Sequence, residues 1–355
     1  MRKEAPMDLW NMLYNLADEL KGMRPWENLW DVDLIGIQEN GRQEPVFVSV
    51  MGRQESGSGT AGGGIDSADG CGIALYEGTR GLGDFQMTGT AQESFIPQDY
   101  AMLEQHALML YWGERMDVPQ DQQDRIKELG RKYHGKGNWP FFLSFQPRFV
   151  PWTPDEREVR MMIETFVQLI EAVNGLREGR TSVDFEKGEF CFRYFDLDEM
   201  GWMTAPARLP FVEQEYDRLE ITDDAFLKEM QALPQNGKTL MMDFAYLHGE
   251  LENERFDRPL NPLLFVAVDA EEGRVIKAGL VSPEERESDT AAEALLNYME
   301  KEGRPQVIAA RNPHILAALQ DLCSQLDIAL QRQPLPGMDQ IADDMRRQMQ
   351  GGMES

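Results

Sequence analysis

The sequence predicts two domains, each mixing α and β structure. Its 355 residues are too many for one hydrophobic core of ordinary size. In the first half, helix-like and strand-like patterns follow one another irregularly, which is typical of an α+β domain. In the second half, three successive strands precede alternating helices and strands, which indicates an α/β domain. We therefore expect an N-terminal α+β domain over residues 1–178, an α/β domain over residues 179–349, and a frayed tail over residues 350–355.

The N-terminal elements follow from the spacing of the apolar residues. Helical spacing predicts a first helix over 8–20, and a glycine-rich loop over 57–64 separates two later strands. Thr153 and Glu156 form a capping pattern that predicts the start of a long helix ending at Gly175. The other expected elements are strands within 23–38, 44–52 and 71–78, helices over 99–116 and 119–133, and an irregular aromatic connector over 137–152.

The C-terminal elements have a regular order. A hairpin over 181–199 and a short helix over 223–233 come first. Alternating and apolar runs then predict three consecutive strands, the second and third joined by a turn at 270–273. The expected elements are strands over 238–250, 261–269, 273–281, 304–310 and 327–330, and helices over 288–302, 313–326 and 338–349.

The charge of the chain excludes several classes of partner. Its 35 lysines and arginines against 62 acids give a net charge of −27, which repels phosphate backbones and anionic lipid. No apolar run reaches the roughly 20 residues that span a bilayer, and no apolar segment at the N-terminus indicates a signal peptide. The three cysteines are far apart. We therefore expect a cytoplasmic protein without a disulfide framework that binds neither nucleic acid nor membrane.

Common catalytic and cofactor motifs are missing from the sequence. The glycines of 57–64 lead into a strand and no Gly-Lys-Ser/Thr follows, which excludes dinucleotide and phosphate-loop motifs. No Cys-x-x-Cys or paired histidine spacing predicts zinc, and no Gly-x-Ser-x-Gly predicts a serine nucleophile. His248 lies near two glutamates, which allows a weak metal site or, more simply, a solvated acidic edge. The sequence thus predicts no bound cofactor.

Two further patterns allow a functional and a structural interpretation. Asp196 and Asp198 would share one face of an extended segment and could bind a divalent cation, although acids are frequent throughout this chain. Aromatic residues crowd the segment 137–152 and could form a peptide-binding groove or simply belong to the core. The aromatic side chains named for such an interaction surface are Trp139, Phe141, Phe145 and Trp152.

The segment 238–349 resembles the ribonuclease H-like core of transposases and integrases. Asp243, in the strand LMMDFAY, stands where that family carries its first catalytic aspartate. The run NPLLFVAVDAEEGRVIKAGLV resembles the next two strands, and GRP followed by IAARNPH resembles the segment that carries the second aspartate. This resemblance implies that Arg311 occupies the second acid position, and that Asp339 or Asp343 provides the third acid.

Arg311 changes what the resemblance implies for chemistry. Two-metal phosphoryl transfer needs carboxylates around cations about 4 Å apart, and an arginine at the bridging position repels those cations. We expect Arg311 to form an ion pair with Asp243 instead. A charged aspartate inside an apolar strand needs such a partner, a metal or a substrate group.

The whole chain also resembles a group of uncharacterised bacterial proteins that pair two domains of unknown function. The segments that carry this resemblance are RPWENLWDVDLIG with VMG and LYEG, the stretch from WP to PWTPDE, and NPLLFVAVDAEEG with GRPQVIAAR. It implies the domain order and a bacterial origin.

The sequence therefore favours a non-catalytic binding or regulatory module that engages a protein partner or small ligand between its domains. The alternative is a Mg²⁺- or Mn²⁺-dependent nuclease or phosphodiesterase that uses Asp243 with Asp269 and with Asp339 or Asp343. Asp269 belongs to that set only if the strand register brings it near Asp243. A third possibility is a structural subunit of a larger assembly.

Overall fold

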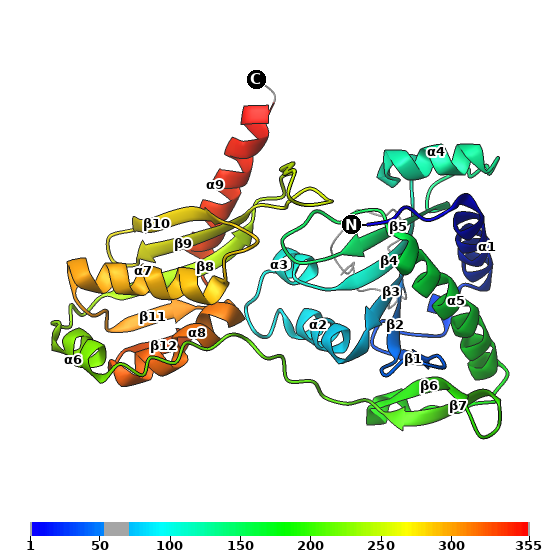
Figure 1. Ribbon diagram of the computed structural model, residues 1–355, viewed down its shortest axis with the longest axis horizontal. Coiled ribbons are helices and arrows are strands. Elements are labelled where there is room, and N and C mark those ends of the chain that lie inside the picture. Colours follow the sequence, from blue (N-terminus) through cyan, green and yellow to red (C-terminus); the bar gives the residue numbers. More distant parts are fainter. Residues whose placement is uncertain (1, 53–70, 354–355) are drawn as a thin grey trace. The chain divides into compact units, whose positions relative to one another are not determined.

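The computed structural model describes residues 2–52 and 71–353 (Figure 1). The expected glycine-rich loop over 57–64 lies outside these residues. The chain divides into two compact units, and each is built from several segments. The first comprises Met1–Met87, Glu104–Pro147 and Pro151–Glu213, and the second comprises Thr88–Leu103, Arg148–Val150 and Gln214–Ser355.

A seven-stranded mixed sheet is the centre of the first unit. Its strand order is β5-β4-β3-β2-β1-β6-β7, and all neighbours are antiparallel except β1 and β6, which are parallel. The strands are β1 (Ile35–Gln38), β2 (Val46–Met51), β3 (Gly72–Glu77), β4 (Ala107–Gly113), β5 (Trp139–Phe145), β6 (Glu189–Asp196) and β7 (Gly201–Arg208).

Helices α1 and α5 pack against each other and against this sheet. The apolar face of α5 is buried, as its spacing predicts, but the helix begins two residues later than expected. Asp155 caps it, because its Oδ1 accepts the Glu158 N–H at 3.0 Å while Glu158 accepts the Asp155 N–H. The hydroxyl of Thr153 accepts a hydrogen bond from Gln122 instead. The helices of the N-terminal half are α1 (Met7–Met23), α2 (Gly78–Thr90), α3 (Gln98–Leu103), α4 (Gln120–Glu128) and α5 (Glu156–Arg177), with 3-10 turns η1 (Pro25–Glu27), η2 (Arg115–Asp117) and η3 (Phe185–Lys187).

Two expectations for this half were wrong. The segment 99–116 forms the short helix α3 followed by β4, and the segment 137–152 contains β5 rather than an irregular connector. Every residue of β4 is buried. A strand buried on both faces shows no alternation of polar and apolar residues, so its apolar run resembles that of a buried helix.

The second unit contains a five-stranded sheet in the order β10-β9-β8-β11-β12. β8, β9 and β10 are antiparallel neighbours, whereas β11 and β12 run parallel to β8. When the five strands are numbered by their order along the chain, their order in the sheet is 3-2-1-4-5. This is the arrangement of the ribonuclease H-like fold, as the sequence predicts. The strands are β8 (Thr239–Tyr246), β9 (Leu263–Asp269), β10 (Arg274–Val281), β11 (Val307–Ala310) and β12 (Ala329–Arg332).

The helices of this unit follow the predicted order. α7 and α8 pack together, and the C-terminal helix α9 packs on β8 through a separate apolar cluster that includes Leu335 and Met338. Among the described residues, no helix is sufficiently long and apolar to cross a membrane. Besides α3, which also belongs to this unit, the helices are α6 (Asp224–Ala232), α7 (Glu287–Glu302), α8 (Pro313–Gln325) and α9 (Pro336–Met353).

The boundary after residue 178 was placed too early. Residues 189–208 form the hairpin β6–β7, and β6 pairs with β1, so this hairpin completes the first sheet. The hairpin expected over 181–199 thus lies over 189–208, with its turn at 197–200, where Asp196 accepts the N–H groups of Asp198 and Glu199. The first unit consequently extends to Glu213.

Candidate functional site

Three charged side chains meet on the α9 face of the second sheet. Arg311 Nε lies 2.7 Å from Oδ2 of Asp243, and the other end of the same guanidinium binds both carboxylate oxygens of Asp339. Asp243 and Arg311 are buried, whereas the Asp339 side chain is half exposed. The pair expected from the sequence is thus in contact, and Asp339 joins it as a third member. We call these three residues the Asp-Arg-Asp triad.

The strand register places each member of the triad. Ala310 is the parallel partner of Met242, so the residues that follow these two, Arg311 and Asp243, lie side by side. Asn312 comes next and caps α8, since its Oδ1 accepts the His314 N–H. Asp339 lies in the first turn of α9.

Burial dominates the electrostatics of Asp243. Desolvation raises the pKa of Asp243 to about 6, although the Arg311 guanidinium beside it acts in the opposite direction. Burial alone would lower the pKa of Arg311, but the two carboxylates raise it above its usual value. At neutral pH Asp243 is therefore mostly a carboxylate facing the guanidinium of Arg311.

The triad does not fit a pair of Mg²⁺ or Mn²⁺ ions. The guanidinium of Arg311 already binds both carboxylates that would have to coordinate the ions. A fixed positive charge at that point repels a divalent cation. In the part of the chain that the structure describes, no group of three or more His, Cys, Asp or Glu side chains could hold a metal ion.

Asp269 does not belong to this site. In the sheet, Asp243 is opposite Val266, whereas Asp269 is opposite Leu240. Cross-strand partners share a face and successive residues alternate, so Asp269 lies on the other face of the sheet. There it accepts the N–H groups of Glu271 and Glu272 in the β9–β10 turn and binds Lys238 Nζ at 2.8 Å. Asp269 is a turn former with a structural ion pair.

The remaining acidic candidates also have structural partners. Asp343 is exposed one turn beyond Asp339 on α9 and pairs with Arg346 at 3.0 Å. Asp196 accepts the N–H groups of Asp198 and Glu199, so these residues form a turn and not the extended segment that would align two carboxylates. His248 lies beyond the end of β8 and contacts Asp99 at 3.1 Å.

The aromatic stretch is largely core. Phe141 and Phe145 are buried in β5, and the half-buried Trp139 ring packs against the ring of Tyr133 at an interplanar angle of 58°. Trp152 alone of the four is exposed, and its backbone pairs with Ser144. Because the buried rings are unavailable to a partner, the four residues do not make a groove together.

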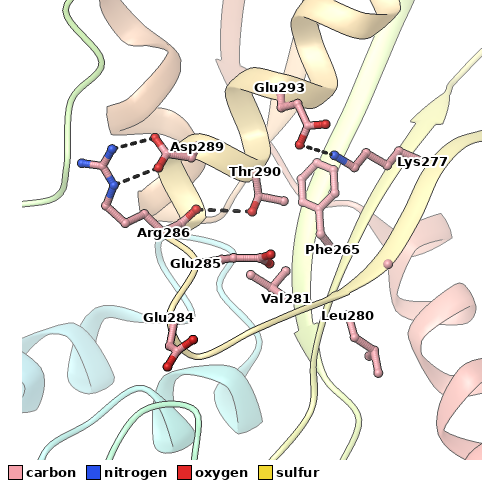
Figure 2. A pocket seen from close by; sticks show the side chains of 11 residues that line it. Phe265, Lys277, Leu280, Val281, Glu284, Glu285, Arg286, Asp289, Thr290 and Glu293 are labelled. Atoms are coloured by element: carbon pink, nitrogen blue, oxygen red, sulfur yellow. Dashed lines mark hydrogen bonds and ion pairs between the residues drawn. The ribbon is translucent and has the colours of Figure 1, made fainter.

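The sequence reasoning missed a cavity of about 580 Å³ between β10 and the start of α7 (Figure 2). The buried ring of Phe265 forms part of its wall. Lys277 pairs with Glu293, and Arg286 binds Asp289 through two hydrogen bonds of 2.9 Å, so both cations are neutralised from α7 (Figure 2). The many charged residues over 282–293 were the sequence feature that could have indicated this cavity.

The family models match domains whose function is unknown. One model, described as domain of unknown function DUF7309, matches residues 10–193, and another, described as domain of unknown function DUF6930, matches residues 226–346. No curated protein matches the chain.

Two solved structures are similar to part of the chain. One is the HTLV-2 integrase catalytic core domain in complex with magnesium, with 19% identity, a TM-score of 0.22, and coverage of 30% of this chain and 65% of that one. The other is the simian T-cell lymphotropic virus intasome in complex with PP2A regulatory subunit B56 gamma, with 21% identity, a TM-score of 0.24, and coverage of 32% and 40%. The chain thus spans less than two thirds of the length of either.

The larger of the two matches, to residues 10–193, covers β1 to β5 and most of β6 of the seven-stranded sheet. That match covers more than half of the chain. The chain belongs to the family defined by the domain of unknown function DUF7309.

Proposed function

We propose that this protein is a non-catalytic binding or regulatory module whose ribonuclease H-like unit no longer performs metal-dependent phosphodiester chemistry. The observation that carries the proposal is the guanidinium of Arg311, which binds Asp243 and Asp339 at once. Carboxylates that a guanidinium already binds do not offer a cation a vacant set of ligands.

The partner in this proposal is a protein or a small ligand rather than nucleic acid or membrane. The net charge of −27 supports that choice, because a protein needs positive potential to hold a phosphate backbone or anionic lipid. The proposed location is the bacterial cytoplasm. No disulfide joins Cys71, Cys191 and Cys323, which supports a reducing compartment.

The test is a calorimetric titration with Mn²⁺. We expect no saturable heat for the wild type or for Asp243→Asn. Arg311→Gln removes the positive charge and leaves two carboxylates facing each other, so we expect this variant to gain weak Mn²⁺ binding. Arg332→Gln, which changes an exposed arginine on β12, is the matched control and should behave as the wild type does.

The competing function is a Mg²⁺- or Mn²⁺-dependent nuclease centred on Asp243. Saturable Mn²⁺ binding by the wild type that Asp243→Asn abolishes would establish a working cation site despite Arg311. Mn²⁺-dependent cleavage of a nucleic acid, lost in the same variant, would then replace our proposal.

A further inference from the structure

The first unit contains a cavity of about 290 Å³ between its sheet and the start of α5. This volume is near the lower end of the range for small-molecule sites, about 300–1,000 Å³. Apolar side chains provide one part of the lining, and charged or polar groups provide the other. The apolar members are Leu75, Ala107, Leu108, Phe145 and Met161, and the charged members are Glu77, Arg80, His106, Arg157 and Glu158.

The register of the sheet brings Leu75, Leu108, Glu77 and His106 to one face, whereas Ala107 and its partner Phe145 belong to the other. Leu108 is opposite Leu75 on β3 and opposite Ser144 on β5. Glu77 is two residues beyond Leu75, and His106 is two residues before Leu108, so both continue the same face. Helix α5 covers this face with Met161, whose side chain is buried.

A buried carboxylate fixes His106 at the cavity wall. Oδ2 of Asp84, which is 5% exposed, lies 3.0 Å from Nδ1 of His106 and accepts the backbone N–H of the same residue at 2.8 Å. With Nδ1 directed to Asp84, Nε2 is the ring nitrogen that remains for a ligand. The His106 side chain is 30% exposed, so it is reachable from solvent.

The carboxylates of the cavity already have cationic partners. Glu77 binds Arg157 at 2.6 Å and Arg42 at 3.2 Å. Glu158 binds Arg2 at 2.8 Å and also accepts the hydroxyl hydrogen of Ser144.

Arg80 differs from these arginines. Within residues 2–52 and 71–353 it has no carboxylate partner, and its side chain is exposed. The cavity therefore combines an apolar wall with one unbalanced positive charge and an oriented imidazole.

From this arrangement we propose that the cavity binds a small amphipathic carboxylate. Its anionic group binds Arg80 and the Nε2 side of His106, and its hydrocarbon part packs on Leu108 and Met161. A guanidinium recognises a carboxylate through charge-assisted hydrogen bonds, and the apolar wall adds affinity for a chain or ring. This site is in the first unit and is independent of the Asp-Arg-Asp triad.

The probe is hexanoate, which has one carboxylate and a short hydrocarbon chain. The readout is the ring C–H resonance of His106, one of only four histidines in the chain. We expect this resonance to shift saturably at millimolar hexanoate and to shift far less with hexanol, which lacks the charge. Arg80→Gln should weaken hexanoate binding about tenfold, the order expected for one charge-assisted hydrogen bond.

Arg208→Gln is the matched control, since Arg208 is an exposed arginine on β7, at the opposite edge of the same sheet from β5. It should leave hexanoate affinity unchanged. The proposal is overturned if the His106 resonance does not respond to hexanoate, if hexanol binds equally well, or if Arg208→Gln weakens binding as much as Arg80→Gln does. Because none of these measurements involves Mn²⁺ or Asp243, their outcome is separate from that of the metal titration.

Discussion

Asp243 gives the fold a pH dependence whose sign follows from its pKa. Burial raises the pKa from 3.8 to about 6 in the folded chain, so the folded state holds an extra proton between these values. The unfolding free energy should therefore fall as pH rises from about 4 to 6, by at most about 3 kcal/mol, and this contribution should be constant above pH 6. Asp243→Asn cannot titrate and should lack that decline.

The measurement is urea unfolding of wild type and Asp243→Asn across this pH range. We expect the unfolding free energy of the wild type, minus that of the variant, to decrease toward pH 6. Asp343→Asn, an exposed carboxyl on α9, is the control and should show no such trend. A difference that increases with pH would mean that Arg311 outweighs burial and holds the pKa of Asp243 below 3.8.

At the residue scale, the sequence identified the ion pair but not the complete site. Asp243 stood out because a carboxylate inside an apolar strand needs a partner, and the family alignment supplied Arg311. The exclusion of Asp269 required the register, since a shift of one residue changes the face of every side chain. His106 was missed because its segment was expected to be helical. A helix would not place His106 and Leu108 on one face of a sheet, as β4 does.

At the element scale, the second unit was predictable because its strands and helices carry clear signals in a regular order. The residue pattern did not predict β4 and β5 as strands, because both faces of each strand are buried and polar and apolar residues do not alternate. It also failed for β6 and β7, since nothing local indicates that β6 pairs with β1, more than 150 residues earlier. Pairing between distant segments depends on the whole sheet and not on the pattern of one strand.

Helix α9 is held in place by Arg346. Its guanidinium donates to the Tyr246 carbonyl at 2.8 Å and binds Asp99 at 2.7 Å, which fastens α9 to β8 and α3. Arg346→Gln should lower the free energy of local opening of α9 by about 1–2 kcal/mol. Amide hydrogen exchange in this helix should therefore accelerate about tenfold.

The control for this prediction is Arg347→Gln. Within the described residues, the hydrogen bonds of the Arg347 side chain go to Asp343 and Asp344, both on α9 itself, so its loss should leave exchange in the helix nearly unchanged. Equal acceleration in both variants would show that helix propensity, rather than the contacts of Arg346, determines the stability of α9.

At the scale of the whole molecule, the second unit is not one continuous stretch of chain. It includes Thr88–Leu103 and Arg148–Val150, which the sequence analysis assigned to the N-terminal domain. Arg148 is buried, donates to the Ser282 carbonyl at 2.7 Å and pairs with Glu287 at 3.2 Å. A fragment that starts at residue 214 therefore lacks groups that the unit needs, even though it contains all five strands of the sheet.

We expect the fragment 214–355 to be several kcal/mol less stable than the same unit in the full chain. Without Arg148, the carboxylate of Glu287 and the carbonyl of Ser282 lose their buried partner, and loss of one member of a buried pair costs about 3–5 kcal/mol. Hydrogen exchange of the β8 and β9 amides, compared between fragment and full chain, should accelerate at least about a hundredfold. Arg148→Met in the full chain keeps α3 in place and should produce part of this effect. If the fragment and the full chain exchange equally slowly, residues 214–355 fold independently, and the two N-terminal segments contribute nothing to the stability of the unit.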